Sequence, residues 1–358
     1  MLARWAGMEP RVVTLRPRPP WFGGTLQTVR ALRWPIPPRL PPGHRLWLPL
    51  PDGDALAATL HLPDAGAPAR PLAALVHGLT GSEDDPYLRE TAAGLLRRGF
   101  PVLRLNLRGG TKSQPRSTSH YHLGRSSDLA EALATLPDAL TRDGVVVAGW
   151  SLGGALALLL LAREEERRGG APILAGAAVC PPLQPEVAHA AIDANAVLGR
   201  TLLALYRKEV LAVPARDLDE NLRRAAAHAT SLHEFEATVT APRFGYPSYE
   251  VFVEMERPGA ALPRIRVPTL LLMGGDDPLV PASSLDEIDW SECPAVAPML
   301  VRGAGHCGFY DIGRENLSVR AIGAFFEGAA DGAGAAAASV EAEEAAAPAS
   351  PAADPAVA

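Results

Sequence analysis

A serine enclosed by glycines is the residue of this chain best suited to nucleophilic chemistry. Residues 146–155 read VVAGWSLGGA, in which an apolar run enters a Gly-x-Ser-x-Gly sequence around Ser151 and a leucine-rich stretch follows. This pattern is typical of a nucleophile elbow, a tight turn between a strand and a helix that exposes the serine hydroxyl. Small residues also let a helix pack closely on a sheet, so the pattern indicates catalysis only if partners for Ser151 exist.

Two later segments supply such partners. A serine hydroxyl needs a base that accepts its proton and a carboxylate that orients the base. One apolar run leads into GGDDP, which contains Asp277, and the next leads into GAGH, which ends at His306. Each motif follows a predicted strand, and the order Ser, Asp, His along the chain is the order found in α/β-hydrolases. We therefore predict a triad of Ser151, His306 and Asp277.

Asp276 is the alternative carboxylate, because it lies directly before Asp277. We prefer Asp277 because Pro278 fixes the turn that follows it, and Asp276 is then expected only to cap that turn. Taken singly, an aspartate before proline is usually a turn residue and a lone histidine is usually structural. It is their order and their position after strands that favour the catalytic interpretation.

Acyl transfer also requires N–H donors for the oxyanion that develops during attack. The backbone N–H of Leu152, directly after the serine, is one candidate. The loop HGLTG after the first predicted parallel strand offers the N–H of Leu79 as the other. We expect the His77 side chain to brace this loop. His120 and His122 either line the pocket or belong only to a loop.

No metal or cofactor site is predicted. Paired ligands at zinc spacing are missing from the sequence, and the glycines around Ser151 lack the lysine of a phosphate-binding loop. The chain has three widely spaced cysteines, Cys180, Cys293 and Cys307, which indicate neither a disulfide framework nor a zinc site. A reducing, cytoplasmic location fits this cysteine usage.

Charge and hydropathy limit the classes of molecule that the chain is expected to bind. The net charge of -6 comes largely from the acidic last thirty residues, so the body carries no concentrated basic surface for nucleic acid. No signal peptide is expected, since charged residues and glycine interrupt the apolar residues at the N-terminus. The longest apolar run, residues 155–162, is far shorter than the roughly 20 residues that span a bilayer. The sequence is compatible with peripheral contact with a membrane, and it does not predict the oligomeric state.

The pattern of elements predicts an α/β fold with a mostly parallel sheet flanked by helices. A hairpin is expected around the turn PDGD, followed by alternating strands and helices, a rhythm that breaks after the Pro181–Pro182 pair and resumes near residue 267. We accordingly divide the chain as follows: a Pro/Arg-rich extension without regular structure but packed on the body, 1–43; a core, 44–182 and 263–327; a helical cap insertion, 183–262; and a disordered Ala/Glu/Pro tail, 328–358.

Several of these stretches together resemble the YheT-like branch of the α/β-hydrolases, which includes phospholipase-like members. The matching sequences, spread over residues 22–327, are LQT (26–28), HGLTGS (77–82) with PY (86–87), NLRG (106–109), YHLG (121–124), GWSLGG (149–154), DDP (276–278) and GHCGF (305–309). The resemblance implies the same triad and an esterase-like activity. Thr25 and Ala155 replace a histidine and an asparagine that are frequent in the family, and neither position belongs to the chemistry.

Together these observations predict a serine hydrolase that cleaves carboxylic esters with short-to-medium acyl chains. The expected substrate is a small molecule, and a lipid-like ester is one candidate. Two alternatives remain open. An acyltransferase or thioesterase would use the same residues with a different acceptor or acyl donor. A non-catalytic binding protein would keep the fold without the reaction, because fold alone does not fix function.

Overall fold

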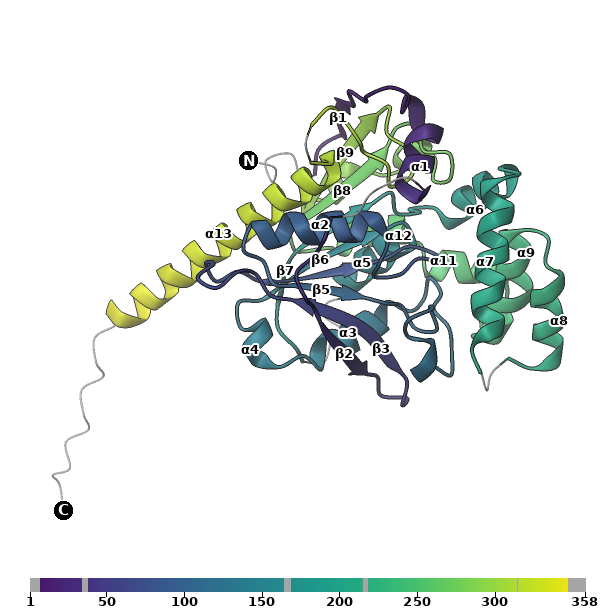
Figure 1. The fold of residues 1–358 in the computed structure, drawn as a ribbon, viewed down its shortest axis with the longest axis horizontal. Coiled ribbons are helices and arrows are strands. Elements are labelled where there is room, and N and C mark those ends of the chain that lie inside the picture. Colours follow the sequence, from purple (N-terminus) through teal and green to yellow (C-terminus); the bar gives the residue numbers. More distant parts are fainter. Residues whose placement is uncertain (1–6, 34–37, 164–168, 215–217, 314, 347–358) are drawn as a thin grey trace, which may run out of the picture.

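The structure is a computed structural model that describes residues 7–33, 38–163, 169–214, 218–313 and 315–346. Its centre is a nine-stranded sheet in the order β1-β9-β8-β7-β6-β4-β5-β3-β2 (Figure 1). The strands are β1 (Arg11–Thr14), β2 (His44–Pro49), β3 (Ala55–His61), β4 (Leu72–Val76), β5 (Val102–Leu105), β6 (Val145–Trp150), β7 (Ile173–Val179), β8 (Thr269–Gly274) and β9 (Val296–Arg302). Only β3 runs against its neighbours β2 and β5, so the sheet is mostly parallel, as predicted.

Helices cover both faces of the sheet because its central strands are apolar on both sides. In β4, Ala73 and Leu75 belong to the cluster that contains Leu88 of α2 (Pro86–Arg97) and Phe326 of α13 (Leu317–Ala346). The alternate residues of β4 belong to the other cluster, with α3 (Ser126–Ala134) and α5 (Leu152–Ala162). The alternation follows from the two-residue period of a strand. A short helix, α4 (Asp138–Thr141), precedes β6.

Between β7 and β8 the chain forms a group of helices beside the sheet, in teal and green in Figure 1. They are α6 (Pro185–Ala194), α7 (Leu198–Ala212), α8 (Glu220–His228), α9 (Leu232–Phe235), the π-helical turn η4 (Glu236–Thr240), α10 (Ala241–Arg243), α11 (Tyr249–Met255) and α12 (Pro258–Ala261). The sequence predicts helical stretches in this insertion, one of them near residues 187–210. The chain instead breaks at Asn195, whose side chain accepts a hydrogen bond from the N–H of Leu198 and so begins α7.

The N-terminal segment differs from expectation, since it contains regular structure. β1 pairs in parallel with β9, and α1 (Gly23–Arg33) follows it. The reason lies in the spacing of the prolines, which cluster outside these two windows and leave residues 11–14 and 23–33 free to form backbone hydrogen bonds. Two of the three tryptophans of this segment, at positions 5 and 34, lie outside the described residues.

The C-terminal segment also differs from expectation. Disorder was expected from residue 328, yet α13 continues to Ala346. Alanine has the highest intrinsic helix propensity, so an alanine-rich stretch forms a helix without the apolar periodicity on which the expectation relied. Residues 347–358 lie outside the described part of the chain. None of the described helices has the length and apolar character needed to cross a membrane.

Candidate active site

Ser151 lies at the turn between β6 and α5, and its backbone is held in an unusual conformation. Its φ of 52° and ψ of -123° place a non-glycine residue at positive φ, a conformation that costs free energy and persists only where the surroundings enforce it. The neighbouring glycines provide that enforcement through close contact. A Cβ atom on Gly149 would lie 2.0 Å from the carbonyl oxygen of Gly153, and one on Gly153 would lie 2.3 Å from that of His77. The predicted elbow is therefore present.

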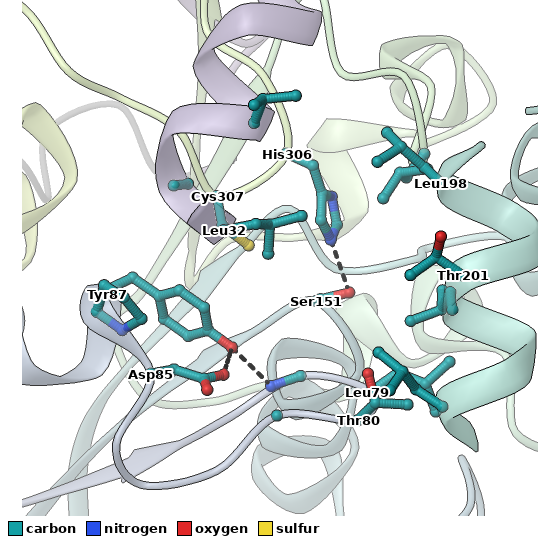
Figure 2. A pocket seen from close by; sticks show the side chains of 18 of the residues that line it. Leu32, Leu79, Thr80, Asp85, Tyr87, Ser151, Leu198, Thr201, His306 and Cys307 are labelled. Atoms are coloured by element: carbon teal, nitrogen blue, oxygen red, sulfur yellow. Dashed lines mark hydrogen bonds between the residues drawn. The ribbon is translucent and has the colours of Figure 1, made fainter. Parts of the chain in front are cut away.

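The structure brings the three predicted triad side chains together. The Nε2 atom of His306 lies 3.0 Å from the Oγ atom of Ser151, and its Nδ1 atom lies 2.8 Å from Oδ2 of Asp277 (Figure 2 shows the first contact). The other carboxylate oxygen of Asp277 accepts hydrogen bonds from the N–H groups of Leu279 and Val280, at 2.8 and 2.9 Å. Both Asp277 and His306 are buried, so this hydrogen-bonded chain has little competition from solvent.

The charge of Asp277 controls the protonation of His306. Burial disfavours the charged imidazolium, but the adjacent Asp277 carboxylate and, to a smaller extent, Cys307 together raise the pKa of His306 well above its ordinary value of 6.5. A carboxylate at Nδ1 also fixes the tautomer, since the neutral ring then carries its proton on Nδ1 and presents the lone pair of Nε2 to Ser151.

Leu79 and Leu152, the predicted oxyanion residues, both lie beside Ser151. Leu152 is the first residue of α5, where N–H groups have no partner within the helix. In the loop after β4, the N–H groups on either side of Leu79 are used, since Gly78 and Thr80 donate to the hydroxyls of Tyr87 and Tyr121. Within the described residues the N–H of Leu79 donates to no other group, so it is available to a ligand.

His77 braces this loop, as expected. Its Nδ1 atom lies 2.7 Å from the carbonyl oxygen of Gly78, and its Nε2 accepts a hydrogen bond from the N–H of Leu107. The Gly78 carbonyl and the Leu79 N–H belong to one planar peptide unit and point in opposite directions. By holding the carbonyl, His77 fixes the direction of the N–H. Burial lowers the pKa of His77, so the ring stays neutral and keeps this pair of contacts.

The two other histidines considered in the sequence, His120 and His122, lie in different surroundings. His120 is buried in an aromatic cluster with Tyr121 and Tyr206, and its Nδ1 lies 2.9 Å from the Tyr121 carbonyl oxygen. His122 lines a small cavity next to Ser151.

Helix α1 holds the loop that carries His306, and sequence reasoning assigned it no part in the site. The hydroxyl of Thr28 accepts a hydrogen bond from the backbone N–H of His306 at 2.8 Å. The side chain of Gln27 accepts from the N–H of Tyr310 and donates to its carbonyl oxygen. Contact is close enough that a Cβ on Gly305 would lie 1.9 Å from the carbonyl oxygen of Gly24. The sequence LQT at 26–28 is part of the family resemblance and so pointed to this segment, but only the folded chain shows which residues it contacts.

The described residues form a larger and a smaller cavity that both adjoin Ser151. The larger, of about 620 Å³, is mostly apolar. In Figure 2, Leu32 of α1 and Leu198 of α7 approach the Ser151–His306 pair from different sides. The smaller, of about 60 Å³, shares Leu79 and Ser151 with the larger one and lies beneath α6, η4 and α11.

One group of side chains near the site has the donor types of a metal site. Atoms of Cys180, Asp277 and His306 lie within 4.8 Å of one another. The Asp277 oxygens already accept the hydrogen bonds described above. Burial raises the pKa of the Cys180 thiol and so keeps it in the neutral form, which is a poor metal ligand. These three residues do not fit a metal ion.

With this geometry established, comparison with known proteins gives the family. Residues 74–311 match the family model described as the alpha/beta hydrolase fold. The chain belongs to the α/β-hydrolase family. This confirms the predicted fold, in which Ser151, Asp277 and His306 follow the strands β6, β8 and β9.

Three relatives are similar in sequence. The chain is 28% identical over 271 residues to the putative esterase YheT of Escherichia coli. The aligned region covers 73% of this chain and 77% of that protein. It is 24% identical over 284 residues to medium-chain fatty acid ethyl ester synthase/esterase 2 of Saccharomyces cerevisiae. That alignment covers 72% of this chain and 62% of the yeast protein. It is 22% identical over 247 residues to embryogenesis-associated protein EMB8 of Picea glauca, covering 67% of this chain and 53% of that protein. The match thus spans about half the length of the Picea protein. The YheT-like resemblance is confirmed.

The pKa of His306 provides a test of the Asp277 contact. Asp277→Asn removes the largest influence that raises the pKa of His306 and leaves burial opposed by Cys307 alone, so we expect the pKa of His306 to fall from above 6.5 to below it. The measurement is an NMR titration of the His306 ring, with Asp276→Asn as the matched control that leaves its pKa in place. A pKa that stays above 6.5 in Asp277→Asn would show that another group holds the charge.

The contact between Thr28 and His306 provides a second test. Thr28→Val keeps the shape of the side chain but leaves the buried His306 N–H without an acceptor, which costs about 1–3 kcal/mol. We expect the free energy of unfolding to fall by that amount in urea titrations. Thr28→Ser keeps the hydroxyl and serves as control. Equal stability of the two variants would argue against the contact.

Proposed function

We propose that the chain is a serine hydrolase that cleaves carboxylic esters. The observation that carries this proposal is the hydrogen-bonded chain from Asp277 through His306 to Ser151 at one wall of a large apolar cavity. Ser151 is the nucleophile, His306 the general base and Asp277 the carboxylate that orients the base. The N–H groups of Leu79 and Leu152 stabilise the oxyanion. The similarity to a putative esterase and to an ethyl ester synthase/esterase supports the same class of reaction.

The reaction follows from the geometry. His306 Nε2 accepts the proton of the Ser151 hydroxyl as its oxygen attacks the ester carbonyl carbon, and the carbonyl oxygen becomes an oxyanion beside the two N–H groups. The imidazolium that forms is stabilised by Asp277 and then donates its proton to the departing alcohol. A water molecule, deprotonated by His306, attacks the acyl-enzyme and releases the acid and Ser151.

The substrate class follows from the walls of the large cavity. Leu198 and Leu202 of α7 line it, and Leu32, Val197 and Leu205 line it while also exposing apolar surface. These exposed apolar side chains suit a lipid-like ester. They are also compatible with peripheral contact with a membrane. We propose that residues 183–262 act as a cap over the site and favour short-to-medium acyl chains. The three cysteines are unpaired and buried, in keeping with the cytoplasmic location that we propose.

Removal of the nucleophile tests the reaction. We expect Ser151→Ala to lower kcat on a p-nitrophenyl ester by a factor on the order of 10⁴ or more, because the variant lacks the hydroxyl that forms the acyl-enzyme in the proposed mechanism. Circular dichroism should show the fold unchanged, and a fluorophosphonate probe should label the native chain but not the variant. Ser283→Ala, at an exposed serine, is the control. Turnover retained in Ser151→Ala would reject the mechanism.

Acyl chain length tests the cap. Each methylene that enters the apolar cavity contributes about 0.8 kcal/mol, so kcat/KM should rise about fourfold per methylene until the cavity is full. We expect butyrate and octanoate esters to exceed acetate, and palmitate to be poor. Leu202→Trp, which fills part of the cavity, should shift the maximum to shorter chains, whereas Leu62→Trp at an exposed position should not. A flat profile, or a maximum at acetate, would contradict the cap.

A further inference from the structure

The small cavity next to Ser151 differs in character from the large one. Its lining includes Ser151 and both proposed oxyanion residues, and it also includes the polar side chains of His122, His189 and Glu236. A volume of about 60 Å³ exceeds what one water molecule needs and admits only a group of a few heavy atoms. Polar groups that converge on an otherwise apolar cavity usually fix the orientation of a ligand.

Glu236 is the most informative of these groups. Its side chain is 7% exposed in total, and its Oε2 atom is buried without any hydrogen-bond partner. A buried polar atom without a partner costs free energy, so it calls for an explanation such as a missing ligand. Glu236 also begins a π-helical turn, a rare local structure that is frequent at functional sites.

The protonation of Glu236 indicates what it can bind. Burial raises the pKa of its carboxyl to about 7, despite the nearby hydroxyls of Thr240 and Tyr206, which favour the charged form. At or below neutral pH much of the carboxyl is therefore protonated. A protonated carboxyl both donates and accepts hydrogen bonds, whereas it attracts a cation only weakly.

The two histidines of the cavity are neutral as well. Burial lowers the pKa of His122 well below its ordinary value and that of His189 to about 4. The N–H of Gly124 donates to Nδ1 of His122, so the proton of that ring is on Nε2. His189 uses Nδ1 in a 2.8 Å contact with the Tyr249 hydroxyl. Within the described residues the hydrogen bonds of these two rings are made at Nδ1, so each Nε2 atom can serve a ligand.

We propose that this cavity is a subsite for an uncharged hydroxyl group that the substrate carries a few atoms from its ester carbonyl. This inference rests on the proposed function, because it takes Ser151 as the position of the ester. A hydroxyl matches the site in three respects: it is small, it is neutral, and it both donates and accepts, as Glu236 and the histidines require. The preferred ester then has an apolar part in the large cavity and a hydroxyl in the small one.

The hydroxyl can belong to the alcohol or to the acyl part of the ester, and two isomeric substrates separate these sources. 2-Hydroxyethyl butyrate carries it on the alcohol, and ethyl 3-hydroxybutyrate carries it on the acid, while ethyl butyrate lacks it. We expect kcat/KM of the native protein to be about tenfold higher for one of the isomers than for ethyl butyrate, as one well-placed hydrogen bond provides. Whichever isomer is preferred identifies the source.

Variants at Glu236 then tie the preference to this cavity. Glu236→Leu, of similar size, removes the polar atoms and should abolish the tenfold ratio. Glu236→Gln keeps a donor and an acceptor and should retain most of it. Glu220→Leu, at an exposed position on α8, is the control and should leave the ratio unchanged. Melting temperatures show whether each variant is folded, and the ratio in the native protein is measured without any variant.

Two results would overturn the subsite: no preference for either hydroxyl ester in the native protein, or a preference that persists in folded Glu236→Leu. Neither result affects the proposed function, which is tested by turnover of ethyl butyrate itself. If no ester is cleaved and the fluorophosphonate probe leaves Ser151 unlabelled, it is the proposed function that fails.

Discussion

The close approach of α5 to the ends of β4 and β6 is the constraint on which the rest of the site depends. It is possible only because Gly149 and Gly153 lack side chains, and it forces the intervening Ser151 into a positive φ that exposes its hydroxyl. The same contact brings the loop after β4 to Ser151, since a Cβ on Gly78 would lie 3.0 Å from the Cβ of the serine. A larger residue at Gly149 or Gly153 would move the Ser151 hydroxyl away from the N–H groups of both Leu79 and Leu152.

The histidine loop is fixed by a different part of the chain. Helix α1 lies outside residues 74–311, the region that matches the family model, yet it hydrogen-bonds to the backbone on both sides of Cys307. In the mechanism that we propose, His306 must be held to within a fraction of an ångström of its hydroxyl partner. In this chain an N-terminal helix supplies that support, and Leu32 at its end also lines the large cavity.

The helices between β7 and β8 contribute residues to both cavities beside Ser151. α7 contributes aliphatic side chains to the large cavity, while α6 and η4 contribute a histidine and a carboxyl to the small one. The two cavities therefore differ in chemistry: the larger is mostly apolar, and the smaller also carries polar side chains. Specificity in this protein is then expected to lie in the inserted helices, and the reaction itself in the ends of the core strands.

The sequence by itself determined the alternation of strands and helices and the order of Ser151, Asp277 and His306, because these depend on local pattern and on turns a few residues long. It also indicated Leu79, Leu152 and the bracing role of His77. It did not reveal β1 or α1, because the prolines around them dominate the composition, and it missed the length of α13, because alanine forms helices without periodicity. The contact of Thr28 with His306 spans 278 residues, and the cavity around Glu236 joins side chains from separate loops and helices. Such long-range contacts depend on how the elements pack, so only the tertiary structure decided them.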